Sequence, residues 1–343
     1  MVKVKSKFRN ISDTNLLLLI TVVIFFLMYV GAMVFLGKGF LKPQTFLNLL
    51  NNYSALIITA CGMSLVMITG GIDISVGGVV ALVSMSCAVH LDYQGGNVFT
   101  ALLIALGIGL AFGIVQGFLV AYLDIQPFIV SLAGMFFARG MTTIVHKEPF
   151  NVQNEAFKAL KDTRLIIPGL GAANRAGVYI DAYIEIGVIV ALLVVILLFC
   201  TLRWTKKGRY FYAVGGNKQS ALMLGINVKK TKFMSHLICS GLTGLAGFVY
   251  FMHVGSGSAL NAKGMEMNAI ASSIIGGTML TGGVGNVIGT LFGVLSLGTI
   301  QNIVSSAGLD DAWWTGITIA GMLCLFLVIQ SVVMARKRKL MAK

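Results

Sequence analysis

Long apolar runs separated by short polar stretches follow one another along nearly the whole chain. A helix needs about 20 mainly apolar residues to cross the hydrocarbon layer of a membrane, and ten runs reach or approach that length. The predicted spans are 16–36, 50–69, 74–91, 98–122, 127–145, 181–203, 231–254, 267–281, 283–305 and 312–334. The pattern predicts an all-α integral membrane protein in which residues 1–343 form one transmembrane domain.

Glycine pairs interrupt the pattern between the second and third spans and again between the eighth and ninth. Because glycine lets the backbone break and approach a neighbour closely, short or broken helices are expected at both places. The strings 67–77 and 279–289, which contain these pairs, match at five positions under an offset of 212. The match favours two parallel internal repeats; the alternative is coincidence in a chain with 41 glycines.

Basic residues indicate how the spans are oriented, because Lys and Arg in short loops stay cytoplasmic. The N-terminal tail, the segment 203–232 and the C-terminal tail together hold 17, against eight in the connectors on the other side. This distribution predicts that both termini are cytoplasmic, which requires an even number of spans. Residues 204–230 then form a cytoplasmic loop, and residues 146–180 form an extracytoplasmic loop with one short helix near 154–164.

Composition supports a lipid environment. The chain is 57% hydrophobic and 11% charged, whereas an ordinary soluble domain has about 25% charged residues. The net charge of +14 raises the question of nucleic-acid binding, but the basic residues lie mainly in connectors between apolar runs. The expected surroundings are therefore a lipid bilayer, and no nucleic-acid partner is expected.

The sequence nominates no catalytic, nucleotide-binding or metal site. Motifs of the types G-x-x-x-x-G-K-[ST], H-E-x-x-H and G-x-S-x-G do not occur. The five cysteines stand singly in apolar runs, without the spacing of metal ligands or disulfides. The chain is therefore not expected to be an enzyme or to bind a cofactor or metal itself.

Asp73 stands among glycines in an apolar part of the sequence. A carboxylate at membrane depth costs about 2.5 to 3.5 kcal/mol on insertion scales, so Asp73 should face a cavity, a partner or an interface. One interpretation is a helix cap, in which the carboxylate accepts hydrogen bonds from the backbone N–H of Ser75 or Val76. The other is direct contact with a substrate, and the two can coexist.

Three strings, in this order and spacing, resemble one known family. They are Gly70-Gly-Ile-Asp-Ile-Ser-Val-Gly77, the segment 208–225, and Ile275-Gly-Gly-Thr-Met-Leu-Thr-Gly-Gly283. Over about residues 46–330 the chain resembles the permease subunits of bacterial ABC sugar importers of the ribose, xylose and galactose class. Within that class, residues 131–140 and 310–315 look most like one permease of a galactofuranose importer.

The resemblance implies a multi-pass permease subunit of the bacterial cytoplasmic (inner) membrane that forms the path for a monosaccharide, with galactofuranose as the leading candidate. It implies three partners: a separate ABC ATPase that binds ATP and Mg, an extracytoplasmic sugar-binding protein, and a second permease chain, either different or identical. A neutral sugar needs a weakly polar path. The residues expected to form it are Thr69, Gly70, Gly71, Asp73, Ser75, Asn268, Ser272, Ser273 and Asn286. Packing or helix capping is the alternative role for each.

The resemblance also implies that the loop 204–230 couples the chain to the ATPase through a short helix from Asn217 to Gly225. The residues expected to take part are Arg209, Gly215, Gly216, Asn217, Ala221 and Gly225. Gly215-Gly216 is expected to form a turn, Asn217 to cap the helix and Gly225 to end it. Many family members have Glu-Ala-Ala after Asn217, whereas this chain has Lys218-Gln-Ser220, so a partner contact through that carboxylate is in doubt.

Two functions of other classes are alternatives: a secondary transporter or channel that works without ATP, and a non-transporting receptor or scaffold. Ion-coupled carriers usually need ionisable relays inside the membrane, and here Asp73 and Glu185 are the only candidates. Arg139, inside a predicted span, is expected to reach the membrane surface or to pair with a carboxylate.

Overall fold

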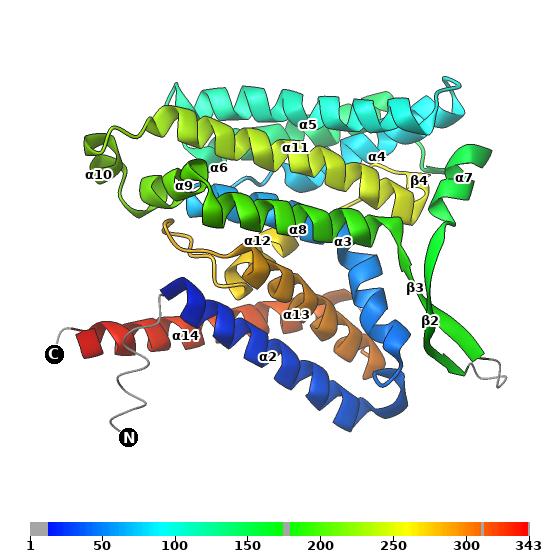
Figure 1. Ribbon diagram of the computed structural model, residues 1–343. Coiled ribbons are helices and arrows are strands. Elements are labelled where there is room, and N and C mark those ends of the chain that lie inside the picture. The colour runs from blue at the N-terminus through cyan, green and yellow to red at the C-terminus, as the bar shows by residue number, and fades with distance from the viewer. Residues whose placement is uncertain (1–12, 174–178, 310–311, 342–343) are drawn as a thin grey trace.

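The computed structural model describes residues 13–173, 179–309 and 312–341, and helices dominate it (Figure 1). Within these ranges, eight helices are long and apolar enough to cross a membrane. They are α2 (Asp13–Leu36), α3 (Pro43–Ile68), α5 (Val98–Ala121), α6 (Pro127–Val145), α8 (Ile186–Trp204), α11 (Val228–Val254), α13 (Val287–Ser306) and α14 (Ala312–Met341). The prediction of an all-α membrane protein is confirmed.

The other two predicted spans correspond to shorter helices next to the glycine pairs. Helix α4 (Val76–Asp92) has 17 residues and α12 (Met265–Ile275) has 11. The predicted span 267–281 is wrong in its second half, because the helix stops before Gly276-Gly277 and Gly277 has a φ of +89°. Residues 276–286 continue without helical structure to the start of α13, so α12 covers only part of the membrane thickness.

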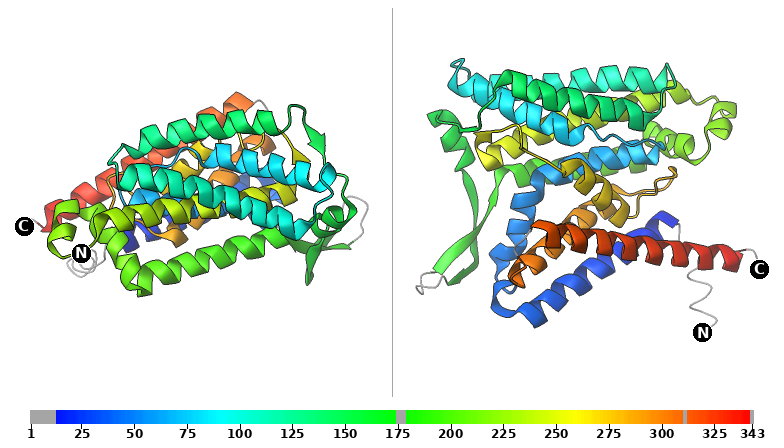
Figure 2. Two further views of the ribbon diagram at one scale, coloured as in Figure 1. Left: turned by 90° about the horizontal axis from the view of Figure 1, so that it is seen from above. Right: turned by 180° about the vertical axis from the view of Figure 1, so that it is seen from behind.

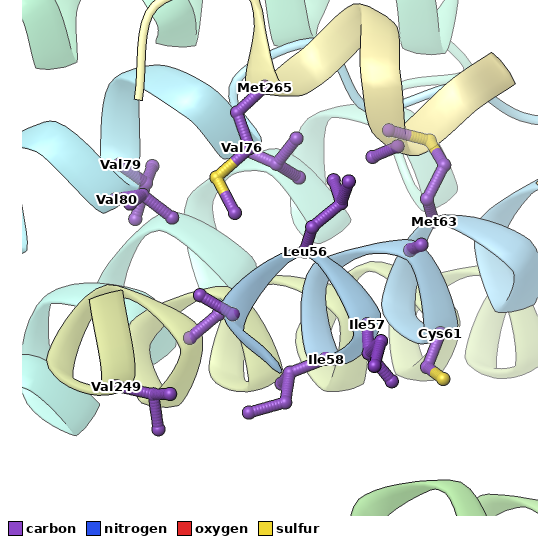
Figure 3. Close-up of a cluster of buried hydrophobic side chains, with 14 of the residues drawn as sticks. Leu56, Ile57, Ile58, Cys61, Met63, Val76, Val79, Val80, Val249 and Met265 are labelled. Carbon is purple, nitrogen blue, oxygen red and sulfur yellow. The ribbon is translucent and has the colours of Figure 1, made fainter. Parts of the chain in front are cut away.

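Helix α3 lies at the centre of the bundle and contacts α8, α11, α12 and α13. Helix α11 packs along α5 and α4, while α13 packs against α2 and α14, so α3 and α12 stand between two groups of helices (Figures 1 and 2). Figure 3 shows the core at this position, where Leu56 of α3 lies near Val76 of α4 and Met265 of α12, while Met63, farther along α3, points towards a later part of α12. Most of α3 is buried, and most of α14 faces outward.

The two ends of the bundle differ. Two short helices, α9 (Lys206–Gly216) and α10 (Lys218–Met223), lie at the end where α2 begins and α14 ends (Figures 1 and 2). The opposite end carries α7 (Glu155–Lys161) and the hairpin β2 (Arg164–Ala173)–β3 (Tyr179–Glu185). This arrangement agrees with an even number of passes. Following the distribution of basic residues, we name the end with α9 and α10 the cytoplasmic end, and the end with α7 and the β2–β3 hairpin the outer end.

The outer loop 146–180 contains more structure than its sequence predicted. The expected short helix is α7, whose Phe157 stacks on Phe251 of α11 with ring centroids 4.4 Å apart. The antiparallel β2–β3 hairpin was not predicted, and residues 181–185 belong to it rather than to the span predicted at 181–203. Further short elements are the 3₁₀ turn η1 (Gly37–Gly39) and the antiparallel pair β1 (Phe150–Asn151)–β4 (Ser256–Gly257).

Cysteine labelling tests the orientation. In a variant without the native cysteines, we expect Glu155→Cys to react with a membrane-impermeant maleimide in intact cells, because this exposed residue lies at the outer end. Lys218→Cys, exposed at the cytoplasmic end, should react only after the membrane is permeabilised. The reverse pattern would contradict the assignment of the two ends.

Candidate functional site

Glycines from three distant segments meet at the cytoplasmic end. The backbone N–H of Gly283 donates to the carbonyl oxygen of Ile68 at 2.9 Å, which places the 276–286 loop against the end of α3. Gly215, in the last turn of α9, packs directly on both of these segments. A Cβ at Gly215 would overlap the Ile68 carbonyl oxygen and lie 2.7 Å from the Gly283 nitrogen. Gly282 lies against Gly70, since its Cβ would be 3.1 Å from the Gly70 Cα. We call this contact of Ile68, Gly70, Gly215, Gly282 and Gly283 the glycine junction.

The junction brings together the two strings that match in sequence. Gly70 and Gly282, equivalent under the offset of 212, have φ values of +81° and +83°. The helices that follow these two glycines begin at Val76 and Val287. Under the same offset Val76 corresponds to position 288, so the two starts agree within one residue. A left-handed backbone and a direct contact both favour glycine. These observations support the predicted parallel repeat.

Helix α9 supplies the third part of the junction, and here one prediction is wrong. Gly215 and Gly216 do not form a turn; they are the last residues of α9, and the chain changes direction at Asn217. The helix continues this far because Gly215 packs against backbone atoms of two neighbouring segments, which hold the last turn in place. Helix α9 is fixed further by the Tyr212 hydroxyl, which donates to the Gly285 carbonyl at 2.9 Å.

Helix α10 is the short helix expected after Asn217. The Asn217 side chain caps it by accepting from the Ser220 N–H at 2.9 Å, and Gly225, with φ +75°, follows its end. Ala221 is buried against Val214 and Val228. The apolar tip that follows was not predicted; in it Leu222 is exposed, and Met223 and Leu224 are 80% and 78% exposed. Three apolar residues directly before a terminating glycine are the pattern that could have indicated it.

Asp73 is fully buried, and its hydrogen bonds are made within the protein. One carboxylate oxygen accepts from the Ser75 N–H at 3.0 Å and the Ser75 hydroxyl at 2.6 Å, while the other lies 3.5 Å from the Ser240 hydroxyl. The Gln116 amide donates to the Ser75 hydroxyl at 2.9 Å. The capping interpretation named a bond from the Ser75 N–H, and this bond is present, but α4 begins at Val76 with Ser75 as its N-cap and without a side-chain cap bond. Asp73 therefore closes the turn before the helix rather than capping it. Ser240 and Gln116 were not predicted, because they come from α11 and α5, far away in the sequence.

Most of the other predicted path residues are also buried in helix packing. The Thr69 hydroxyl lies 3.1 Å from that of Ser235, and the Ser273 hydroxyl donates to the Ala269 and Ala60 carbonyls. Ser272 is fully buried, and its hydroxyl has no hydrogen-bond partner in the described part of the chain. Gly71 packs against Pro127. The structure thus shows packing roles for this group, and a path role stays a prediction.

The remaining two predicted path residues lie at cavities. Asn286 caps α13 by accepting from the Ile288 N–H at 2.9 Å and lines a cavity at the cytoplasmic end. Asn268 lines a cavity of about 300 Å³ at the outer end of α3, α11 and α12. The lining of this outer cavity consists of Asn52, Tyr53, Ala55, Leu56, Tyr250, Leu260, Ala262, Lys263, Met265 and Asn268. Two amides and two tyrosines therefore meet there.

Arg139 holds one wall of the outer cavity in place. Its guanidinium donates to the carbonyls of Ala259, Asn261 and Ala262 at 3.1, 2.7 and 3.0 Å. The hydrogen-bonded partners are carbonyls rather than a carboxylate. The reason is that the loop between β4 and α12 presents several carbonyls outside a helix, and the planar guanidinium can serve them together. This loop lies at the outer end, so the reach of Arg139 towards the membrane surface stays a prediction.

Comparison with known proteins identifies the family. Residues 45–327 match the family described as "Branched-chain amino acid transport system / permease component". The chain belongs to this permease family. It is 37% identical over 316 residues to the inner membrane ABC transporter permease protein YjfF of Escherichia coli K12, with 92% of each chain covered.

Two further relatives are similar over most of their length. The fructose import permease FruG of Bifidobacterium longum is 36% identical, covering 92% of this chain and 91% of its own. The ribose import permease RbsC of Escherichia coli K12 is 33% identical, and the match covers 80% of this chain and 82% of RbsC. No solved structure matches the chain. The family supports a permease component of an ABC transporter, in agreement with the sequence strings.

Proposed function

We propose that this chain is the permease subunit of an ATP-driven monosaccharide importer in the bacterial cytoplasmic membrane. The observation that carries the proposal is the link between α10 and the glycine junction. Helix α10 presents an apolar tip at the cytoplasmic end, and α9, directly before it, packs on the ends of both glycine-rich segments. A partner that moves α10 would therefore move the ends of α3 and the 276–286 loop.

The partner proposed for α10 is a separate ABC ATPase that carries ATP and Mg. Ala221 anchors α10 to the protein, so Leu222, Met223 and Leu224 are left to enter a hydrophobic groove of the partner. Lys218, where many family members have a carboxylate, lies 3.5 Å from Asp124. The docking contact proposed here rests on the apolar tip rather than on that carboxylate.

The outer cavity supports a neutral monosaccharide as substrate. Its amides, together with the exposed Lys263 at its edge, provide hydrogen bonds for sugar hydroxyls, and its tyrosine rings provide apolar faces. Two relatives are named for the import of fructose and ribose, and galactofuranose is the leading candidate for this chain. An extracytoplasmic sugar-binding protein would deliver the sugar at this end. The exposed sides of α6 and α14 are available to a second permease chain, different or identical, or to lipid.

The two carboxylates that the sequence nominated as ion relays both have protein partners. Asp73 is buried and hydrogen-bonded inside the protein. Glu185 is half-buried at the outer end, 2.7 Å from the His253 imidazole. These partners disfavour both carboxylates as relays across the membrane. Glu266 differs, because its Oε2 is buried without a hydrogen-bond partner among the described residues, and the ion-coupled carrier stays the alternative there.

Charge placed in the apolar tip tests the proposed function. In proteoliposomes with the cognate ATPase and sugar-binding protein, Met223→Glu combined with Leu224→Glu should lower ATPase affinity by at least about 30-fold, the effect of losing a binding hot spot. Uptake should fall with it. The matched control is Leu41→Glu, since Leu41 is 62% exposed at the outer end. Uptake that persists with the double variant, or without ATP hydrolysis, would contradict the proposal.

The same uptake assay identifies the sugar. Unlabelled galactofuranose is expected to compete best within a panel that includes ribose, xylose, galactose and fructose. If another monosaccharide competes more strongly, the chain is still a permease of a monosaccharide importer, but its substrate is that sugar rather than galactofuranose. Competition by none of them would contradict the assignment to monosaccharides.

A further inference from the structure

A second cavity, of about 310 Å³, lies at the cytoplasmic end between the start of α2, the end of α8, α9 and the start of α13. Its lining combines polar and apolar side chains. They are Thr14, Asn15, Phe199, Leu202, Arg203, Tyr212, Asn286 and Val287. We call this cavity the inner pocket. Asn286 is one of the predicted path residues and Tyr212 fixes α9 to the Gly285 carbonyl, but neither proposal gives this cavity a ligand.

The polar side of the inner pocket favours an anion. Among the described residues that line it, the one charged residue is the exposed Arg203, and none is acidic. Within the described residues, the two ion pairs join Lys218 to Asp124 and His253 to Glu185, so Arg203 forms neither. Burial raises the pKa of Tyr212 to about 12, which keeps its phenol neutral at physiological pH. Asn286 uses its side-chain oxygen as a cap and retains amide donors.

The apolar side of the inner pocket indicates where the anion comes from. Phe199 and Leu202 belong to the last two turns of α8, and the next residue after Arg203 is Trp204, which is 70% exposed. A tryptophan at the end of a span is typical of the level of the lipid headgroups. Towards the membrane centre, Ile196 and Leu197 of α8 and Leu19 and Val23 of α2 are exposed. These exposed side chains belong to two of the helices that line the pocket, farther from the cytoplasmic end, and offer apolar surface to acyl chains.

We propose that the inner pocket binds the phosphate of an anionic phospholipid of the cytoplasmic leaflet. Arg203 binds the phosphate, Thr14 and Asn286 surround the headgroup, and the acyl chains lie along α2 and α8. Anionic lipids concentrate on this side of a membrane protein where basic residues gather. Because Tyr212 and Asn286 also adjoin the loop of the glycine junction, the lipid would stabilise that loop.

Native mass spectrometry of the full chain, released from nanodiscs, tests this proposal. With phosphatidylcholine and 20% phosphatidylglycerol, we expect one phosphatidylglycerol to be retained per chain. Arg203→Gln should reduce retention by about tenfold or more, the effect of losing a hydrogen bond between charged groups. Arg203→Lys should retain most of it. The control Lys207→Gln removes the same charge from an exposed residue that does not line the pocket, and should bind as the unmodified protein does.

Two further measurements make the outcome decisive. Thr14→Trp, which fills the pocket and leaves Arg203 in place, should also lose the lipid. Inorganic phosphate added to protein in phosphatidylcholine alone should not raise the melting temperature, whereas phosphatidylglycerol should. Equal retention in Arg203→Gln and Lys207→Gln would overturn the proposal, as would stabilisation by inorganic phosphate alone. Each readout is lipid binding or stability, so the proposal can fail while the importer function stands.

Discussion

Replacing Gly215 with valine is expected to uncouple ATP hydrolysis from uptake. A Cβ at this position overlaps the Ile68 carbonyl oxygen and lies close to the Gly283 nitrogen. Both neighbours are backbone atoms, so no side-chain rotation relieves the overlap, and α9 must move away from the glycine junction. Overpacking of this kind costs about 1–3 kcal/mol. If this cost opposes the conformation needed for transport, uptake should fall by about 5- to 150-fold, since each 1.4 kcal/mol corresponds to a factor of ten, while the ATPase continues to hydrolyse ATP.

The measurement is uptake per ATP hydrolysed in proteoliposomes, with size-exclusion chromatography as a check of assembly. Gly107→Val is the matched control, because Gly107 lies in α5 and a Cβ there would meet no neighbouring segment within 4 Å. A normal ratio of uptake to hydrolysis in Gly215→Val would contradict the role given to the junction. Loss of assembly in both variants would point to a general effect of valine in a helix.

The parts of the fold that depend on local sequence were predictable. Span positions follow from runs of apolar residues, and the α10 cap at Asn217 and stop at Gly225 follow from residues within one short segment. The β2–β3 hairpin was missed because its isoleucines resemble the start of a span. The alternation of Tyr179, Asp181 and Tyr183 with apolar residues, which has the period of a strand, indicates it in retrospect.

Contacts between distant segments were not predictable from one sequence. The glycine pairs indicated broken helices, but no periodicity relates Ile68, Gly215 and Gly283, which meet only in the folded bundle. The partners of Arg139 and Asp73 were hidden for the same reason. Asp73 illustrates both cases: its bond from the neighbouring Ser75 was predicted, and its contact with Ser240 was not.

The second large effect is expected at Asp73, where two substitutions separate the loss of charge from the loss of hydrogen bonds. Asp73→Asn retains one oxygen that can accept both bonds from Ser75, and its amide can donate to the Ser240 hydroxyl. This variant should keep most of its stability and uptake. Asp73→Ala leaves the buried Ser75 N–H and hydroxyl without their acceptor, which costs about 1–3 kcal/mol of the free energy of unfolding.

Thermal unfolding in detergent and uptake in proteoliposomes, measured on the same preparations, decide between the two roles of Asp73. A structural role that acts through hydrogen bonds requires Asp73→Ala to unfold at a lower temperature and Asp73→Asn to behave nearly as the unmodified chain. Ser240→Ala is the control, because it removes only the 3.5 Å contact and should change stability little. If Asp73→Asn keeps its melting temperature but loses uptake, the negative charge itself takes part in transport, because the hydrogen bonds from Ser75 are preserved in that variant.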